Sequence, residues 1–333
     1  MDELTEIKKK FRGLRQQTRK GDLFQSLGPI ISENLRALPS QGFTPVVLPE
    51  NGEHALERFQ TYDHQLDHRN DDILNNIKVP PILDEDIQLA ISQLANPSPK
   101  YRDTGAFLFL SDIIQNELIS ENQLRWLTQS LVSDEQLFSH ILEPENDGIY
   151  GRSFSILVLS LLLFTQRTKT HFMSADQLDL VINQIALYVA LERDTRGFIG
   201  TNGWAHAFTH SGNVLAELFM MPEIMRADKL FLLASILAGY RELKQPLMMG
   251  ETERLVEVIM YAANAHELYA DYVLLTLKLW RKDLVTQRGL KTEAQWHQLY
   301  NRSRFFHEII LRGSQNVPKK LYDYAEQTKD YLT

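Results

Sequence analysis

Two histidines spaced four residues apart form the most suggestive chemical pattern in this sequence. His206 and His210 lie in the segment 203–213, which reads GWAHAFTHSGN. On a helix of 3.6 residues per turn, this spacing places both rings on one face, and Asn213 and Glu217 continue the same stripe. Two such imidazoles can bind a divalent ion, with zinc or manganese the best fit. The pattern predicts a metal site at His206 and His210 or a polar recognition surface.

The helix that would position these histidines is expected over residues 203–220. Trp204 and Phe208 fall roughly opposite the histidines, on an apolar stripe that should pack behind them. The segment lacks Lys and Arg between residues 196 and 226, which indicates a covered face. Gly212 in mid-helix costs about 1 kcal/mol relative to alanine, so another backbone or a ligand is expected close to it.

A charged link just before this helix supplies candidate catalytic groups. Glu192 or Asp194 could act as a general base, and Arg196 could contribute to binding. Asp194 and Arg196 could equally pair with each other or cap helix ends. Arg152, at the start of the most apolar helix, could steady an anionic substrate. A salt bridge to a nearby acid is as good an interpretation of Arg152, because Arg102 stands at the analogous point of the preceding unit.

Composition excludes several classes of protein. The chain has 333 residues, no cysteine, 44% hydrophobic residues and a net charge of −8. A large buried core is expected, and a general nucleic-acid binder is disfavoured because it would need a basic surface. The absence of thiols and of an apolar leader favours a cytoplasmic protein. The longest apolar run, 156–164, is too short to span a membrane, so it is predicted to be a buried core helix.

Helical periodicity dominates, so an all-α fold is predicted. The expected helices cover residues 4–19, 23–38, 53–75, 84–94, 101–116, 121–131, 151–166, 175–192, 203–220, 222–243, 251–262, 266–283, 292–311 and 318–331. Similar openings recur about every fifty residues, with two helices per interval. This period is typical of stacked helical hairpins, either a HEAT- or armadillo-like superhelix or an α/α toroid.

The first eighty residues differ from the rest. Residues 1–80 are expected to form an N-terminal helical extension or cap, and residues 81–333 the helical-repeat domain, with a boundary at the Pro80-Pro81 break. The opening helix carries Lys and Arg on one face and leucine and phenylalanine on another. It is interpreted as a terminal capping helix, with a membrane-surface or partner-binding helix as the alternative.

Three motifs in order resemble a family of bacterial proteins grouped as a domain of unknown function. They are the RSFS stretch at 152–155, the acidic stretch that ends in Arg196-Gly197, and the GWAHA stretch with a second histidine at 203–210. The resemblance covers residues 101–262. It implies a helical-repeat fold with a shared site and implies no reaction. Asn213 departs from the family's usual aspartate, which would weaken metal binding or shift it to Glu217.

Together these features favour a binding or interaction module. Its contact surface would be a concave face lined by His206, His210, Asn213 and Glu217, with Trp204 and Arg196 as further binding residues. It would bind a partner protein or small ligand. A metal-assisted hydrolase is the alternative, with His206 and His210 as ligands, Glu192 or Asp194 as base and Arg152 on an anionic substrate. No complete catalytic constellation is visible, so whether the protein is an enzyme stays open.

Overall fold

The described chain is built of helices joined by turns and loops. A computed structural model describes residues 3–67, 81–286 and 289–329. The structure is 71% helical, with 15 α-helices and no strands among these residues, so the predicted all-α class is confirmed. In chain order the elements are α1 (Glu3–Lys20), α2 (Leu27–Arg36), α3 (Gly52–Asp67), α5 (Asp84–Gln93), the π-helix η1 (Lys100–Phe107), α6 (Leu108–Gln115), α7 (Glu121–Leu131), α8 (Asp134–Leu137), α9 (Gly148–Thr168), α10 (Ala175–Leu191), the 3₁₀-helix η2 (Gly200–Asn202), α11 (Ala207–Met220), α12 (Arg226–Arg241), α13 (Glu251–Ala265), α14 (Glu267–Thr286), α15 (Glu293–Leu311) and α16 (Lys319–Thr328).

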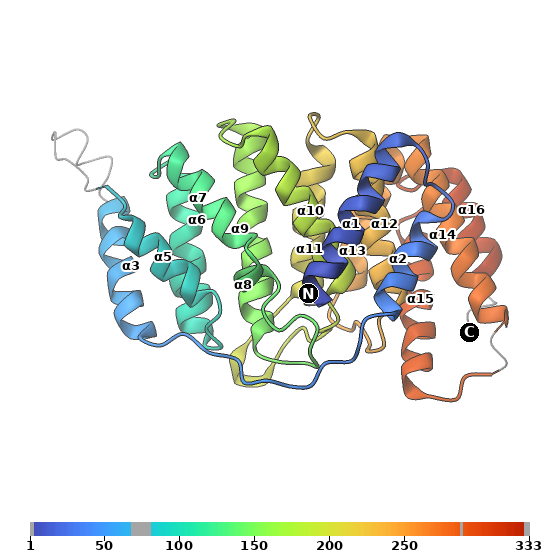
Figure 1. Cartoon of the computed structure of the whole chain (residues 1–333), viewed down its shortest axis with the longest axis horizontal. Coiled ribbons are helices and arrows are strands. Elements are labelled where there is room, and N and C mark those ends of the chain that lie inside the picture. Colours follow the sequence, from blue (N-terminus) through green and yellow to red (C-terminus); the bar gives the residue numbers. More distant parts are fainter. Residues whose placement is uncertain (1–2, 68–80, 287–288, 330–333) are drawn as a thin grey trace.

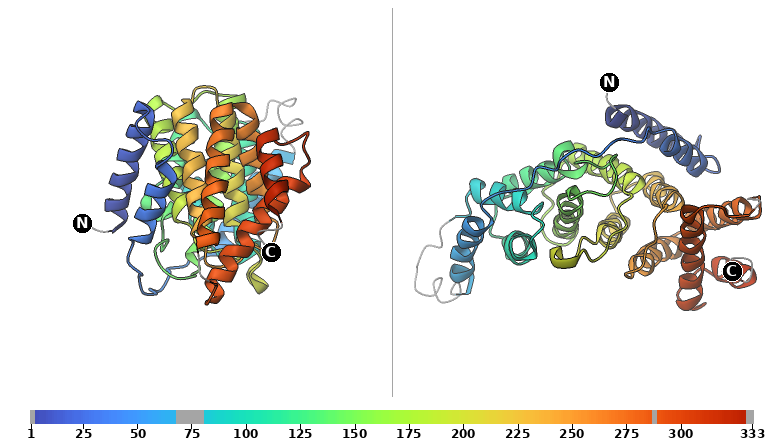
Figure 2. Two further views of the ribbon diagram at one scale, coloured as in Figure 1. Left: turned by 90° about the vertical axis from the view of Figure 1, so that its right-hand side faces the viewer. Right: turned by 90° about the horizontal axis from the view of Figure 1, so that it is seen from below.

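The helices stand side by side in a curved row. The row runs from α3 at one end, through α9 in the middle, to α16 at the other end (Figure 1). Helix α11 packs chiefly between α9 and α13, while α10 packs against α12. Helices α1 and α2 also pack on α12, on the convex side of the curve (Figure 2). Helix α11 therefore belongs to the layer that faces away from α1 and α2.

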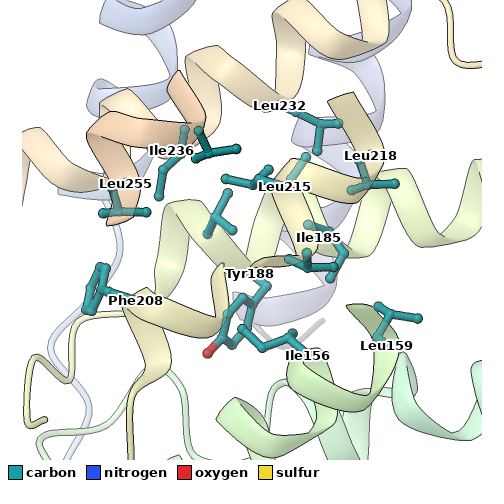
Figure 3. Packing of buried hydrophobic residues seen from close by; sticks show 14 of the residues in the cluster. Ile156, Leu159, Ile185, Tyr188, Phe208, Leu215, Leu218, Leu232, Ile236 and Leu255 are labelled. Carbon is teal, nitrogen blue, oxygen red and sulfur yellow. The ribbon is translucent and has the colours of Figure 1, made fainter. Parts of the chain in front are cut away.

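One continuous apolar core holds the row together. Figure 3 shows its central part, where side chains from α9 to α13 interlock, among them Ile156, Ile185, Leu215, Leu232 and Leu255. Each of these residues is fully buried. Burial of a branched side chain of this size contributes about 1.5–3 kcal/mol. This packing fixes the positions of the helix ends and of the loops between them.

Helix α9 is the buried core helix predicted from the apolar run 156–164. Within the described residues it is the one helix whose length and composition would suffice to cross a membrane, and 83% of its most apolar window is buried inside the fold. Tyr150, Arg152 and Ser155, which lie in its first turns, are also buried. The amino-terminal end of α9 is therefore enclosed by protein.

Three basic side chains of α1 are turned towards protein, while Lys9, Lys10, Arg12 and Lys20 are exposed. Arg15 and Arg19 both donate hydrogen bonds to the carboxylate of Asp228 on α12, and Lys8 pairs with Asp134 on α8. Burial opposes the negative charge of Asp228, but the two guanidinium groups outweigh it and lower its pKa. These contacts support a packing role for α1 over the membrane-surface alternative. The helix was expected to cap the end of the row, whereas it packs on the middle of the row, on α12.

A long segment without helix, residues 37–51, connects α2 to α3. It runs along the lower edge of the molecule in Figure 1, from the α2 side of the row to the far end where α3 lies. Thr44 fastens it by donating from its backbone N (2.8 Å) and its hydroxyl (2.7 Å) to the carboxylate of Glu143. We call residues 37–51 the strap.

One predicted helix needs correction, and another is described only in part. The helix expected over 203–220 begins at Ala207, because Gly203 and His206 have left-handed backbones with φ of 71° and 56°. Such angles interrupt a right-handed helix. The helix expected over 53–75 is α3, which is described as far as Asp67. Its remainder and most of the predicted break before residue 81 lie outside the described residues.

Candidate functional site

Trp204 is held by a short hairpin, residues 197–205, that precedes α11. The backbone N–H of Ile199 donates to the carbonyl of Gly203, and that of Ala205 to the carbonyl of Gly197, each at 2.8 Å. Gly203 has a positive φ, and a Cβ at this position would lie 2.8 Å from Cγ of Pro99. A glycine is therefore required for the hairpin to lie against the loop before η1.

Arg102, on the π-helix η1, anchors this hairpin through hydrogen bonds to its backbone. Its Nη2 donates to the carbonyls of Asn202 (2.9 Å) and Trp204 (3.2 Å). The guanidinium is fully buried and stacks over the rings of Tyr150 and Phe154, 4.5 and 4.7 Å from their centroids. Contacts of this kind stabilise a desolvated cation. Arg102 thus has the structural role that its position in the predicted repeat suggests.

His206 joins the hairpin to α11 and stacks on Trp204. The two rings are nearly parallel, with an interplanar angle of 4° and centroids 4.2 Å apart. Burial lowers the pKa of His206, and the charge of Asp103 on η1 partly opposes this. The Nδ1 atom is buried and no described protein atom hydrogen-bonds to it. Buried polar atoms are rarely left without a partner, so a buried water molecule is the expected partner of this nitrogen.

His210 lies one turn further and is buried. Burial lowers its pKa to about 3, so the ring is neutral at pH 7. Its Nδ1 donates to the backbone carbonyl of Ser153 at 3.0 Å, and its ring meets Phe154 edge-on at 5.4 Å. The centroids of the His206 and His210 rings are 5.7 Å apart. The two histidines are therefore neighbours, but His210 is also a part of the core between α9 and α11.

The other two members of the predicted stripe are engaged elsewhere. Asn213 Oδ1 accepts a hydrogen bond from Arg254 of α13 at 2.9 Å, and Glu217 accepts two from Arg167 of α9 at 2.9 and 3.0 Å. The predicted four-residue face is thus divided between three local clusters. Among the described residues, no three His, Asp or Glu side chains come together in a way that could hold a metal ion.

The close approach predicted at Gly212 is made by a side chain. A Cβ at Gly212 would lie 2.7 Å from Cγ of Arg254, the arginine that binds Asn213. The contact joins α11 to α13. Gly212 therefore accommodates a neighbouring helix of the row and not a bound ligand.

Arg152 and Glu192, two of the candidate catalytic residues, form a buried ion pair. Arg152 donates to the two carboxylate oxygens of Glu192 at 2.9 and 3.2 Å, and each side chain is 2% exposed. Arg152 also donates to the carbonyl of Ser139, and Glu192 accepts from the backbone N–H of Asp194. Burial alone would raise the pKa of Glu192, but the arginine and these hydrogen bonds keep it below the usual value. A carboxylate neutralised in this way is a poor general base.

Asp194 and Arg196 pair with each other, which was one of the two interpretations of this link. Arg196 Nε lies 2.8 Å from Asp194 Oδ1, and its Nη2 donates to the carbonyl of Asn146 at 2.8 Å. Arg152, Glu192 and Asp194 line a cleft with a volume of about 690 Å³ beneath the strap. Neither histidine lines this cleft. The candidate catalytic residues and the candidate metal ligands therefore belong to different surfaces.

The structure adds Phe198 and Met249, which the sequence did not single out, to Trp204 and His206, which it did. Trp204 was expected on the buried stripe, yet it is 39% exposed, and Phe198 opposite it in the hairpin is 52% exposed. Their rings meet edge to face at 5.1 Å. Met249, also exposed, lies against Gly197 of the same hairpin. We call Phe198, Trp204, His206 and Met249 the hairpin patch. The sequence Gly-Phe-Ile-Gly at 197–200 did not predict the exposure of Phe198, because nothing in its local pattern distinguishes an exposed from a buried phenylalanine.

Comparison with known proteins assigns part of the chain to a family. A family model described as "Protein of unknown function (DUF2785)" matches residues 137–311, more than half of the 333 residues. The match begins and ends later in the chain than the resemblance expected over 101–262. It includes the hairpin patch, both histidines and the loop at 192–196. No curated protein and no solved structure matches the chain.

Proposed function

The chain belongs to the DUF2785 family of proteins of unknown function, and we propose that it is a binding or interaction module whose contact surface is the hairpin patch. The observation that carries the proposal is the fixed exposure of two large aromatic rings, Trp204 and Phe198. Aromatic side chains of this kind dominate the energetics of many interfaces. A partner that covers them would bury a large apolar area.

The rigid support of the patch strengthens this proposal. Backbone hydrogen bonds close the hairpin, Arg102 holds its carbonyls, and the His206 ring lies flat on Trp204. Side chains that are already ordered lose little conformational entropy when a partner binds.

We also propose that the curved row is an open superhelix of the HEAT or armadillo type. Helices α9, α11 and α13 pack in one layer, and α10 and α12 in another. The first and last helices of the row, α3 and α16, lie at opposite ends (Figure 1), which argues against a closed α/α toroid. Open rows of this kind offer extended surfaces for partners.

The metal-assisted hydrolase has less support. A catalytic zinc site usually has three protein ligands, whereas here Asn213 and Glu217 are held by arginines. His210 already uses its Nδ1 on Ser153. Stoichiometric zinc or manganese in wild-type protein purified without chelator, and its loss in His206→Ala, would revive this alternative.

The proposed surface can be tested with two tryptophans of similar exposure. Trp204 is 39% exposed and Trp296, on α15, is 45% exposed. We would immobilise wild type, Trp204→Ala and Trp296→Ala, incubate each with extract of the native cells, and quantify the retained proteins and metabolites by mass spectrometry. We expect partners that bind wild type and Trp296→Ala equally and bind Trp204→Ala about thirty-fold more weakly, the effect of losing an interface hot spot.

The same experiment can also refute the proposed surface. Equal retention by Trp204→Ala and wild type, with both variants folded by circular dichroism, would refute the hairpin patch as the contact surface. Loss of partners in both variants would point instead to a wider surface that includes α15.

A further inference from the structure

We propose a second, separate site: the cleft beneath the strap binds a small amphipathic anion, an apolar body that carries a carboxylate or phosphate group, through Arg193. The cleft has a volume of about 690 Å³, within the range of small-molecule sites. It lies between the start of the strap, the loop at 141–145 and the loop at 192–194. The hairpin patch contributes nothing to its walls, so this inference does not depend on the proposed function.

The ion pairs around the cleft leave one of its arginines without an acid. The three buried carboxylates that line the cleft each pair with an arginine. Glu192 pairs with Arg152, Asp194 with Arg196, and Glu242 with Arg36. These three pairs consume the acids nearest to the loop at 192–194. A cation left over in such a setting is available to an anion from solution.

Arg193 is that remaining cation. Among the described residues, no carboxylate lies within ion-pair distance of its guanidinium. Its Nη1 donates to the backbone carbonyls of Glu192 (3.1 Å) and Gly239 (3.4 Å), while Nε and Nη2 make no hydrogen bond with described residues. Burial lowers the pKa of Arg193 to about 10, and the charges of Glu242 and Glu192 only partly oppose this. A bound anion would restore part of the lost solvation and use the two free donors.

The rest of the lining is mixed in charge. Glu143 and Glu145 add two carboxylates, of which Glu143 accepts hydrogen bonds from Thr44 and Glu145 lies 3.8 Å from Arg196. Lys244 lies on the rim with no carboxylate of the described chain beside it and would add a second positive charge. Leu38 and Pro39 of the strap, with Ile141 and Leu191 opposite, supply apolar walls. A site with a few polar groups set among apolar walls is typical of small-molecule recognition.

The test compares a charged probe with its neutral isostere. We would measure the binding of 2-naphthoate and of 2-naphthamide to the full chain by isothermal titration calorimetry and ligand-observed NMR. We expect naphthoate to bind at least ten-fold more tightly than naphthamide, and phenyl phosphate to compete with it. Arg193→Gln should weaken naphthoate binding at least ten-fold and leave naphthamide binding unchanged.

Two further variants keep the test decisive. Arg12→Gln removes the same charge from the exposed face of α1, outside the cleft, and should bind naphthoate as wild type does. If Arg193→Gln proves unstable, Arg193→Lys replaces it in the test. This variant keeps the positive charge and should retain part of the affinity for naphthoate. No naphthoate binding by wild type at millimolar concentration, equal affinity for both probes, or unchanged binding by a folded Arg193→Gln would each overturn the proposal.

Discussion

The buried imidazole of His210 makes stability fall as the solution is acidified. In the folded chain its pKa is lowered to about 3, whereas an unfolded histidine titrates near 6.5. Between these values the unfolded chain takes up a proton that the folded chain cannot accept. The free energy of unfolding therefore decreases as the pH falls through this window, by up to about 1.4 kcal/mol per pH unit. Integrated from pH 7 to pH 5, this one group costs about 2 kcal/mol.

Urea unfolding at pH 7 and pH 5 measures this cost directly. His210→Gln keeps an N–H donor for the carbonyl of Ser153 but cannot titrate. Its stability at pH 7 should be lower than that of wild type, because the packing against Phe154 changes. Its loss of stability between pH 7 and pH 5 should be about 2 kcal/mol smaller than the wild-type loss. His171→Gln, at an exposed position after α9, tests whether removing any histidine has this effect.

The prediction would be refuted by an unchanged pH dependence in His210→Gln. A titration followed by NMR in which the His210 ring protonates near pH 6.5 in the folded protein would refute it independently. Either result would mean that water reaches this ring, and that the contact with Ser153 does not persist in solution.

Two further predictions concern packing and buried charge. Gly239→Ala should destabilise the fold by about 1–3 kcal/mol, because its Cβ would lie 2.4 Å from the backbone oxygen of Val189. Gly13→Ala in α1, where nothing lies within 4 Å of the added Cβ, should stabilise the fold by up to about 1 kcal/mol. Thermal unfolding of both variants distinguishes a decrease from an increase in stability. Glu192→Gln should lower the free energy of unfolding, measured in urea, by about 3–5 kcal/mol, because it leaves the buried charge of Arg152 without its partner. Asp323→Asn breaks an exposed pair with Lys319 and should lower it by less than about 1 kcal/mol. A similar loss in the two variants would contradict the argument from burial.

The sequence predicted the helices well because their signals are local. Ser120 and Thr292 begin α7 and α15 with reciprocal capping boxes, and the corresponding helices were expected at 121–131 and 292–311. The apolar run at 156–164 became the core of α9 for the same reason: burial on all sides needs apolar residues on all sides. The all-α class followed from many such signals in succession.

The site was predicted less well because its geometry depends on distant contacts. GWAHA is compatible with a helix, but Arg102 binds the carbonyls of Asn202 and Trp204 from a hundred residues away, and the start of the segment belongs to a hairpin. Asn213 and Glu217 are on the expected face of α11, yet arginines of α13 and α9 occupy them. Arg193, between two acids in the sequence, resembles a paired residue until the structure shows both acids paired elsewhere. Partners of this kind leave no trace in local spacing.

The attachment of α1 to α12 also has a consequence for synthesis. Arg15 and its partner Asp228 are separated by 213 residues, and translation adds about 5–20 residues per second. The first helix must therefore wait about 10–40 s before its docking surface exists. During this interval its apolar edge and its basic side chains are exposed to the ribosome and to whatever chaperones are near. A segment that is synthesised well before its docking surface is therefore among the last of the described elements to reach its place, and the strap leaves α3 and the following helices room to assemble in the meantime.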